Sequence, residues 1–416
     1  MRNRNITVVI AMGLFLGSGS SFGAGLEKNI MWSGKHAGAA GAAVSTADGA
    51  EAVFFNPAGI ANGKAGSEVS VNFSPGIHDF SAPNYSDSAK MKSGYNLVPV
   101  FGVVGSYGLT PKWGVGIGMY VSAGARAIFN AASLGITGFD MTPKLQSYLD
   151  VSEVALGTGY EIADGLRLGA AFRVVMAQGS FSMAQVVGSN LIAVDLKNLS
   201  ATRFSGLKLG LSYTAPDKTW GFGVAWRNQL DFIASGQSTG SVQAAGPGAT
   251  STLAEAPAKV GLTLPQQFVV GGNYELIKGH LRTMVEYVWT NYSENKTLVV
   301  EASPGGVAVS NVSFNWANQS EARIGFECTA VKNWAFRAGY VYSSQVVPKE
   351  TALAILSSPG AYNTFVAGAG TMIGSTQVDG AFEYSAASGT GGTSSGFLGT
   401  YSTTFLTLHM GATFRF

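Results

Sequence analysis

Ser402–Phe416, with the sequence STTFLTLHMGATFRF, closes the chain and alternates in side-chain character. A period of two places apolar and polar side chains on opposite faces of a β-strand. One face carries Leu406, Leu408, Met410, Ala412, Phe414 and Phe416, and the other carries Thr407, His409, Gly411, Thr413 and Arg415. A final strand of this kind that ends on an aromatic residue favours a bacterial outer-membrane β-barrel. The last strand of a soluble sandwich would alternate in the same way, so the rest of the chain must decide.

The start of the chain has the pattern of an export signal. Arg2 and Arg4 precede the apolar stretch Ile6–Gly17, which is too short to cross a bilayer as a helix. Small residues follow, so we predict a signal peptide over residues 1–23 that is cleaved before Ala24. No later stretch reaches about 18 uninterrupted apolar residues, and any membrane span must therefore consist of strands.

Composition also favours a membrane barrel over a soluble domain. Only 12% of the residues are charged, which is low for a soluble domain, whereas 56 are glycine. The 26 basic and 24 acidic residues nearly balance, so we expect no nucleic-acid partner. The single cysteine, Cys328, excludes an intramolecular disulfide, and we place it on the lipid side of a strand.

Short turns recur along the chain between strand-like runs. Six of them have polar or glycine-containing bends, at residues 110–113, 163–166, 216–220, 277–280, 331–334 and 374–377. Longer polar segments lie between them, at about residues 74–96, 130–147, 179–200, 236–257, 295–315, 346–362 and 386–401. Six short turns, seven long loops and both ends of the barrel on the short-turn side predict an all-β antiparallel transmembrane barrel of about 14 strands over residues 66–416.

The charged residues of the strands fall on the face opposite the apolar one. A Lys or Arg that faces lipid at mid-bilayer costs about 2–4 kcal/mol, so we expect these side chains in the lumen. They are Arg167, Arg173, Lys208, Arg227, Arg282, Arg323, Arg337, Arg415, Glu153, Glu286, Glu321, Glu327, Asp379 and Glu383. They could form a polar wall along a transport path or an ion-pair network that braces the barrel.

The segment over residues 24–65 shows no strand alternation and precedes the first strand. It is rich in Gly and Ala, contains few bulky residues before Val53, and ends in Asn56-Pro57-Ala58-Gly59. Small residues allow close backbone packing, as a compact plug inside a barrel would require. Residues 24–65 are therefore predicted to form an N-terminal hatch that fills the lumen.

Taken with the barrel, Ala24-Gly25-Leu26, Asn56-Pro57-Ala58 and the terminal Phe416 resemble the FadL family of outer-membrane channels. The family transports long-chain fatty acids and, in the related TodX branch, aromatic hydrocarbons. The resemblance implies a fourteen-stranded barrel with a hatch, in which Asn56, Pro57 and Ala58 lie near the bound substrate. It also implies an inward kink in the third strand that opens a lateral portal, whose counterpart is Ser122-Ala123-Gly124-Ala125. The basic head-group contacts of the family have no clear match here.

The predicted function is therefore passive uptake of hydrophobic compounds across the bacterial outer membrane. Long-chain fatty acids are the expected cargo, captured by the loops and released sideways after the hatch rearranges. Leu191-Ile192-Ala193-Val194 and Ala352-Leu353-Ala354-Ile355-Leu356 are apolar loop segments that could make the first capture or pack on each other. An aromatic hydrocarbon channel of the same family and a general diffusion porin are the alternatives.

Enzyme chemistry has little support in the sequence. His36, His78, His280 and His409 are the only histidines, and none stands next to a serine in a nucleophile motif. One cysteine and four scattered histidines give no metal-ligand spacing, so we expect neither a metal nor another cofactor. The expected partners of this predicted monomer are the hydrophobic compound, outer-membrane lipids and the barrel-assembly machinery.

Overall fold

The computed structural model describes residues 32–63, 66–85, 89–94, 96–246, 248–355, 358–393 and 396–416. The predicted signal peptide, residues 1–23, lies outside the described residues. Residues 24–31 and 64–65 of the predicted hatch lie outside them as well. Among the described residues, no helix is both long and apolar enough to cross a membrane.

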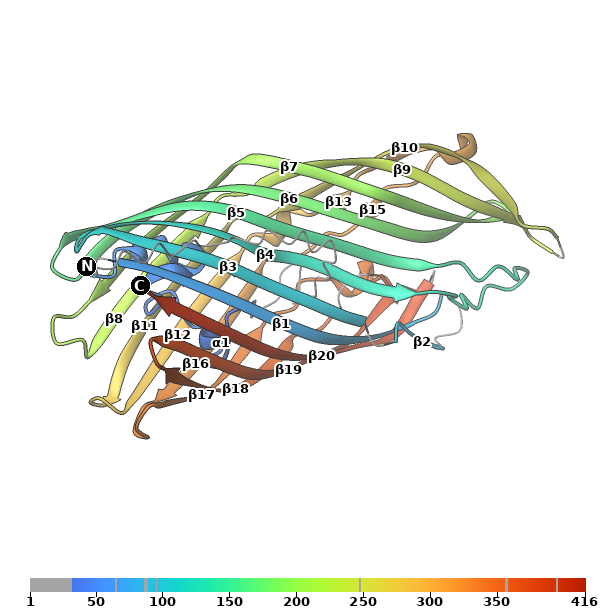
Figure 1. The fold of residues 1–416 in the computed structure, drawn as a ribbon. Helices are drawn as coiled ribbons and strands as arrows, with labels where there is room; N and C mark the ends of the chain where they lie inside the picture. The colour runs from blue at the N-terminus through green and yellow to red at the C-terminus, as the bar shows by residue number, and fades with distance from the viewer. Residues whose placement is uncertain are drawn as a thin grey trace.

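The strands form one antiparallel sheet that closes into a barrel (Figure 1). The first strand, β1 (Gly66–Pro83), pairs on one side with β3 (Asn96–Thr110) and on the other with the last strand, β20 (Gly396–Arg415). Between them run β4 (Trp113–Phe129), β5 (Leu145–Ala163), β6 (Leu166–Val187), β7 (Asn190–Thr214), β8 (Trp220–Arg227), β9 (Leu230–Ala244), β10 (Ser251–Leu264), β11 (Gln267–Ile277), β12 (Leu281–Thr290), β16 (Gln319–Cys328), β17 (Trp334–Ser343), β18 (Tyr362–Ile373) and β19 (Thr376–Thr393).

Two pairs of these strands are single spans with an interruption. β8 and β9 both pair with β7, and β10 and β11 continue the next span across Pro265-Gln266. The wall in the described residues therefore consists of fourteen spans, which confirms the predicted fold. Short additions are β2 (Lys90–Lys92) on β1, β14 (Val300–Ala302) on β10, and the pair formed by β13 (Thr297–Leu298) and β15 (Val312–Ser313).

All six predicted short turns join consecutive spans at one end of the barrel, here called the short-turn end. Most of the opposite connections, at the long-loop end, are shorter than predicted because the strands continue into them; those between β12 and β16 and between β17 and β18 are not. Residues 179–200, predicted as a loop, contain the end of β6 and the start of β7, which meet at Gly188-Ser189. Register shifts near Gly179 and Lys197 interrupt the alternation there, so the pattern of the sequence did not indicate strands.

The apolar face of β20 points outward, as predicted. In β20, Leu408 is 50% exposed and Met410 is 41% exposed, whereas Thr407 and His409 on the other face are buried. Outward apolar side chains suit lipid, and inward polar side chains find partners in the lumen.

Residues 32–63 lie inside the barrel and are here called the plug (Figure 1). The plug contains α1 (Gly34–Ala37), η1 (Gly49–Glu51), α2 (Ala52–Phe55) and η2 (Pro57–Ile60). Its backbone lies so close to the wall that a Cβ atom would not fit at several glycines of the strands. Gly159, Gly169 and Gly210 are cross-strand neighbours in β5, β6 and β7, and a Cβ on each would lie 2.0–2.7 Å from an atom of Asn56 or Pro57.

Apolar side chains fill the interior at the long-loop end. The largest buried cluster includes Phe80, Phe129, Leu196, Phe232, Trp316 and Tyr401. Three short helices lie in the connections at the long-loop end: η3 (Tyr292–Glu294), η4 (Pro304–Gly306) and η5 (Lys349–Thr351). Leu191, Ile192 and Val194 of β7 belong to this cluster, as do Ala352, Ala354 and Ile355, while Leu356 lies outside the described residues. Both predicted capture segments therefore pack into the interior.

The close approach of Gly169 to the plug predicts that Gly169→Val will push the plug out of place. A Cβ at Gly169 would lie 2.2 Å from the Pro57 carbonyl carbon. We expect steady ion conductance in planar bilayers for this variant and little for the unaltered protein. Gly380→Val is the matched control, since the nearest atom to its Cβ is the His409 carbonyl oxygen at 3.6 Å. Equal conductance of the two variants would contradict the prediction.

Candidate functional site

A cavity of about 80 Å³ lies in the lumen between the plug and the wall, and is here called the lumen pocket. The plug lines it with Ser33, Ala37, Gly41, Val44, Phe54 and Phe55. The strands line it mainly with polar and charged side chains: Ser122, Glu153, Arg173, Lys208, Arg227, Glu286, Glu321 and Arg323. Aromatic plug residues and a charged wall therefore meet at one site.

Three carboxylates of the pocket have arginine partners. Arg173 Nη1 donates to Glu153 Oε1 at 2.9 Å, and both side chains are almost fully buried. Arg323 bridges Glu286 at 3.0 Å and Glu321 at 2.7 Å. The same arginine donates to the Gly41 carbonyl oxygen of the plug at 3.1 Å, so these residues brace the wall and hold the plug together.

Two further cations share the pocket with these pairs. Lys208 of β7 stands directly opposite Arg227 of β8 in the ladder, and both line the cavity. The Lys208 ammonium donates to the Phe54 carbonyl oxygen and lies 4.9 Å from the centre of the Phe54 ring. Like charges that are directly opposite in a sheet destabilise each other. The pocket lining therefore has a positive excess, with four cations to three carboxylates, where an anion would relieve the repulsion.

Asn56, Pro57 and Ala58 do not line the pocket; they fix the plug to the wall. Asn56 is fully buried and donates through Nδ2 to the Val44 carbonyl oxygen at 2.7 Å and to the Leu211 carbonyl oxygen of β7 at 3.0 Å. Its Oδ1 accepts from the Ala58 amide and caps η2, in which Pro57 is the first residue. Phe54 and Phe55, directly before the motif, are the residues that reach the pocket.

The Ser122–Ala125 segment coincides with an irregularity of the third span. The β4–β5 register shifts between Val121 and Ala123, which leaves Ser122 as the extra residue of a β-bulge. Ser122 lines the lumen pocket, Ala123 and Gly124 are buried, and the backbone of Ala125 pairs with Leu149. A β-bulge thus lies in the segment that the resemblance assigns to the portal.

The ladder between β3 and β4 ends at the same level. Its last pair is Gly102 with Tyr120, and residues 96–101 of β3 continue in the ladder with β1 alone. Beyond this point the Arg126 side chain reaches from β4 to the Leu97 carbonyl oxygen at 3.1 Å, while the Arg126 carbonyl oxygen contacts His78 Nδ1 at 2.9 Å. We call this parting of the two strands the β3–β4 opening.

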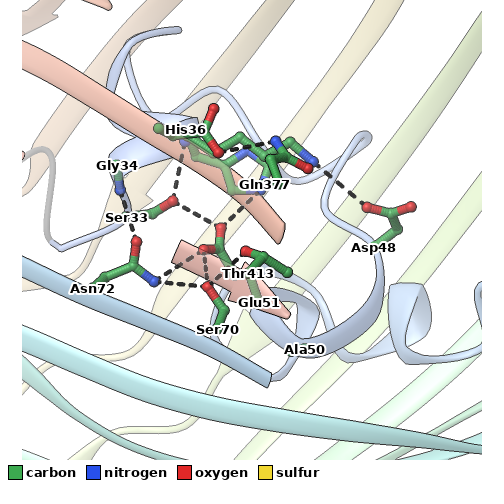
Figure 2. A network of polar contacts seen from close by, with 12 residues as sticks. Ser33, Gly34, His36, Asp48, Ala50, Glu51, Ser70, Asn72, Gln377 and Thr413 are labelled. Atoms are coloured by element: carbon green, nitrogen blue, oxygen red, sulfur yellow. Dashed lines mark hydrogen bonds and ion pairs between the residues drawn. The ribbon is translucent and has the colours of Figure 1, made fainter. Parts of the chain in front are cut away.

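A buried carboxylate ties the plug to the seam between the first and last strands (Figure 2). Glu51 accepts from Ser33 Oγ at 2.7 Å, from Ser70 Oγ at 2.8 Å and from Asn72 Nδ2 at 3.0 Å. Thr413 of β20 in turn donates to Ser70 Oγ at 3.1 Å. These contacts join one plug carboxylate to side chains of β1 and, through Ser70, to β20.

A second cavity lies on the short-turn side of the plug. Its lining includes Lys35, His36, Asp48, Arg282 and Arg337. Burial, followed by the charges of Lys35 and Arg337, holds the pKa of His36 well below its ordinary value. The imidazole is then neutral near pH 7, and its 3.3 Å contact with Glu51 is not an ion pair.

One histidine does meet a serine in space, which the sequence did not reveal. His409 Nδ1 lies 2.8 Å from Ser74 Oγ, and His409 Nε2 lies 2.8 Å from Glu383 Oε2. The three residues come from β1, β19 and β20, so no local motif could have indicated them. Ser74 also donates to the Trp32 carbonyl oxygen at 3.1 Å. The side chains of His409 and Glu383 are at most 1% exposed. This buried series of hydrogen bonds therefore holds the plug to the wall.

Comparison with known proteins agrees with this architecture. A family model described as outer membrane protein transport protein (OMPP1/FadL/TodX) matches residues 15–396. No curated protein matches the chain.

Several solved structures share the fold at low sequence identity. A Pseudomonas aeruginosa FadL homologue is 14% identical, with 94% of this chain and 99% of that chain covered and a TM-score of 0.77. The P. putida toluene transporter TodX is 16% identical with the same coverage and TM-score. The Ralstonia pickettii toluene transporter TbuX is 19% identical, with 90% and 97% covered and a TM-score of 0.68.

The hydrogen bonds of Asn56 predict that Asn56→Asp will loosen the plug. The carboxylate has the same shape but cannot donate, so the carbonyl oxygens of Val44 and Leu211 each lose a bond, at a cost of about 1–3 kcal/mol for a buried group. We expect faster amide hydrogen exchange in residues 52–60 and unchanged exchange in the strands. Asn318→Asp is the control, because Asn318 is exposed and accepts only, from the Ser293 amide. Unaltered exchange in residues 52–60 would refute this role of Asn56.

Proposed function

The chain belongs to the OMPP1/FadL/TodX family of outer membrane transport proteins, and we propose that its cargo is a long-chain fatty acid. Members of this family are channels for hydrophobic compounds and not enzymes, and the protein is a β-barrel of the bacterial outer membrane. The proposal concerns the identity of the cargo and the route by which it leaves.

The observation that carries the choice of cargo is the cationic side of the lumen pocket. Lys208 and Arg227 face each other next to the aromatic side chain of Phe54. A carboxylate bound there would gain charge-assisted hydrogen bonds and relieve the repulsion between the two cations. A neutral hydrocarbon would gain neither, and its burial would desolvate charged groups without compensation.

The apolar cluster at the long-loop end supports the same cargo. A chain of methylene groups passing through it would gain about 25 cal/mol for each Å² of apolar surface removed from water. The lumen pocket itself, at about 80 Å³, is far below the roughly 300–1,000 Å³ of a site that holds a whole ligand. A carboxylate group fits this volume, whereas the chain requires neighbouring side chains to move.

The β3–β4 opening supports lateral release. Ser122 belongs both to the lumen pocket and to the bulge at this opening, so the pocket adjoins the place where the strands part. Cargo that leaves here enters the bilayer and never has to cross the plug. Asn56, Pro57 and Ala58 then contribute by holding the plug next to the path, and Ser122, Ala123, Gly124 and Ala125 form its edge.

Two other functions are alternatives to fatty acid uptake. Aromatic hydrocarbon uptake is the second candidate, because the toluene transporter TodX has the same fold at the same TM-score as the FadL homologue. A general diffusion porin would need an open lumen, and here the plug packs against the wall on many strands.

The cargo is tested by the double variant Lys208→Gln/Arg227→Gln. The variant loses two charged hydrogen-bond donors, each of which contributes about 1.5–3 kcal/mol. We therefore expect the fatty acid concentration that gives half-maximal uptake to rise at least about tenfold. Uptake of toluene, which has no charge, should not change. Initial rates are measured in cells that lack other uptake channels. Unchanged fatty acid uptake, or a wild-type protein that transports toluene alone, would refute the proposal.

The route is tested by substitution of Gly124, which is buried in the bulged strand. Gly124→Trp should fill the β3–β4 opening and reduce uptake, whereas Gly124→Ala should retain most of it. Folding is checked by the mobility of the unheated barrel on denaturing gels. Normal uptake by correctly folded Gly124→Trp would exclude release at this place.

A further inference from the structure

Trp32 occupies the space between the lumen pocket and the β3–β4 opening. Its indole is fully buried and packs against Phe54, at 5.1 Å between ring centres, and against Tyr120, at 5.8 Å. Phe54 lines the lumen pocket, and Tyr120 is the last residue of β4 that pairs with β3. The indole thus contacts aromatic residues of the pocket and a residue of the opening.

The wall is shaped to receive this indole at the opening. A Cβ on Gly102, the partner of Tyr120 in the last pair of the ladder, would lie 2.3 Å from the Trp32 ring. Val98 and Val100, from the part of β3 that has left β4, belong to the same buried cluster as Trp32. The ring therefore lies behind the stretch of wall where the two strands are no longer joined.

Packing holds the Trp32 side chain. Among the residues that the structure describes, the buried indole Nε1 has no hydrogen-bond partner. The backbone, in contrast, is fixed: Ser74 donates to the Trp32 carbonyl oxygen, and Glu51 and Asn72 hold the next two residues, Ser33 and Gly34. Rotation of this side chain would therefore break packing contacts and none of the hydrogen bonds that hold the plug backbone.

We propose that the Trp32 side chain is the stopper of the lateral path and that its rotation sets the size of compound that can pass. This inference rests on the proposed release at the β3–β4 opening. One rotatable side chain then closes the path, and the remainder of the plug stays in position while the cargo passes.

The first test measures access from the membrane and needs no transport. Val100→Cys in a Cys328→Ser background places a thiol in the buried cluster that contains Trp32, and a lipid-soluble maleimide in proteoliposomes reports its exposure. Trp32→Ala should speed labelling about tenfold, because a buried thiol reacts only when its cover opens. Trp32→Phe, which keeps an aromatic ring, should stay near the original rate.

A second cysteine distinguishes an effect of the Trp32 side chain from loosening of the whole plug. Ala381→Cys lies in another buried cluster, with Ala37 and Ala40 of the plug. Its labelling should not respond to Trp32→Ala. Equal rates at Val100→Cys with and without Trp32 would overturn the proposal, and so would an equal acceleration at both cysteines, since the whole plug would then have come loose.

Uptake supplies an independent measurement. Trp32→Ala should raise the initial uptake of bulky hydrophobic compounds more than that of small ones. Trp316→Ala is the matched control, because Trp316 is also buried with an unpartnered Nε1 but stacks on Phe314 at the long-loop end. An equal effect of the two variants would overturn the role of Trp32. Absence of uptake by the wild-type protein would contradict the proposed function and leave the labelling result intact.

Discussion

A strand inside a bilayer has no water with which to satisfy its backbone, and this constraint governs the whole molecule. Each span must pair on both sides, so β1 pairs with β20 and the sheet closes. Closure creates an inside and an outside with opposite chemical demands. Leu408 can face lipid because its neighbour Thr407 faces the lumen, and the charged side chains that lipid excludes gather inside. The ion pairs and the plug occupy the space that closure creates.

The β3–β4 opening is where this constraint is relaxed, and the structure compensates around it. Residues 96–101 of β3 leave the ladder with β4, and the Arg126 guanidinium donates to the Leu97 carbonyl oxygen across the parting. Behind it, Trp32 and Tyr120 supply apolar packing in place of a continuous wall. The lumen pocket, the bulge at Ser122 and the aromatic cluster thus meet at the place where the β3–β4 ladder ends.

The sequence predicted those features whose physical signal is local. Alternation in Leu406–Phe416 and the six short turns predicted the barrel, because each depends on neighbouring residues. Sequence reasoning missed contacts between distant strands, such as Ser74 with His409, and it missed Trp32 because a single aromatic residue has no pattern. It also took residues 179–200 for a loop, since bulges hide the alternation of β6 and β7. Glycines on the polar face of β5, β6 and β7 were a usable signal for where the plug touches the wall.

The contacts of Glu51 connect the plug with closure of the barrel. Its carboxylate accepts hydrogen bonds from Ser70 and Asn72 of β1, and Ser70 accepts one from Thr413 of β20, the strand that pairs with β1 to close the barrel. Gly34 of the plug also lies against Gly411 of that strand. The plug therefore contacts both strands of the seam at which the sheet closes. Retention of the plug and alignment of the two closing edges thus depend on the same buried carboxylate.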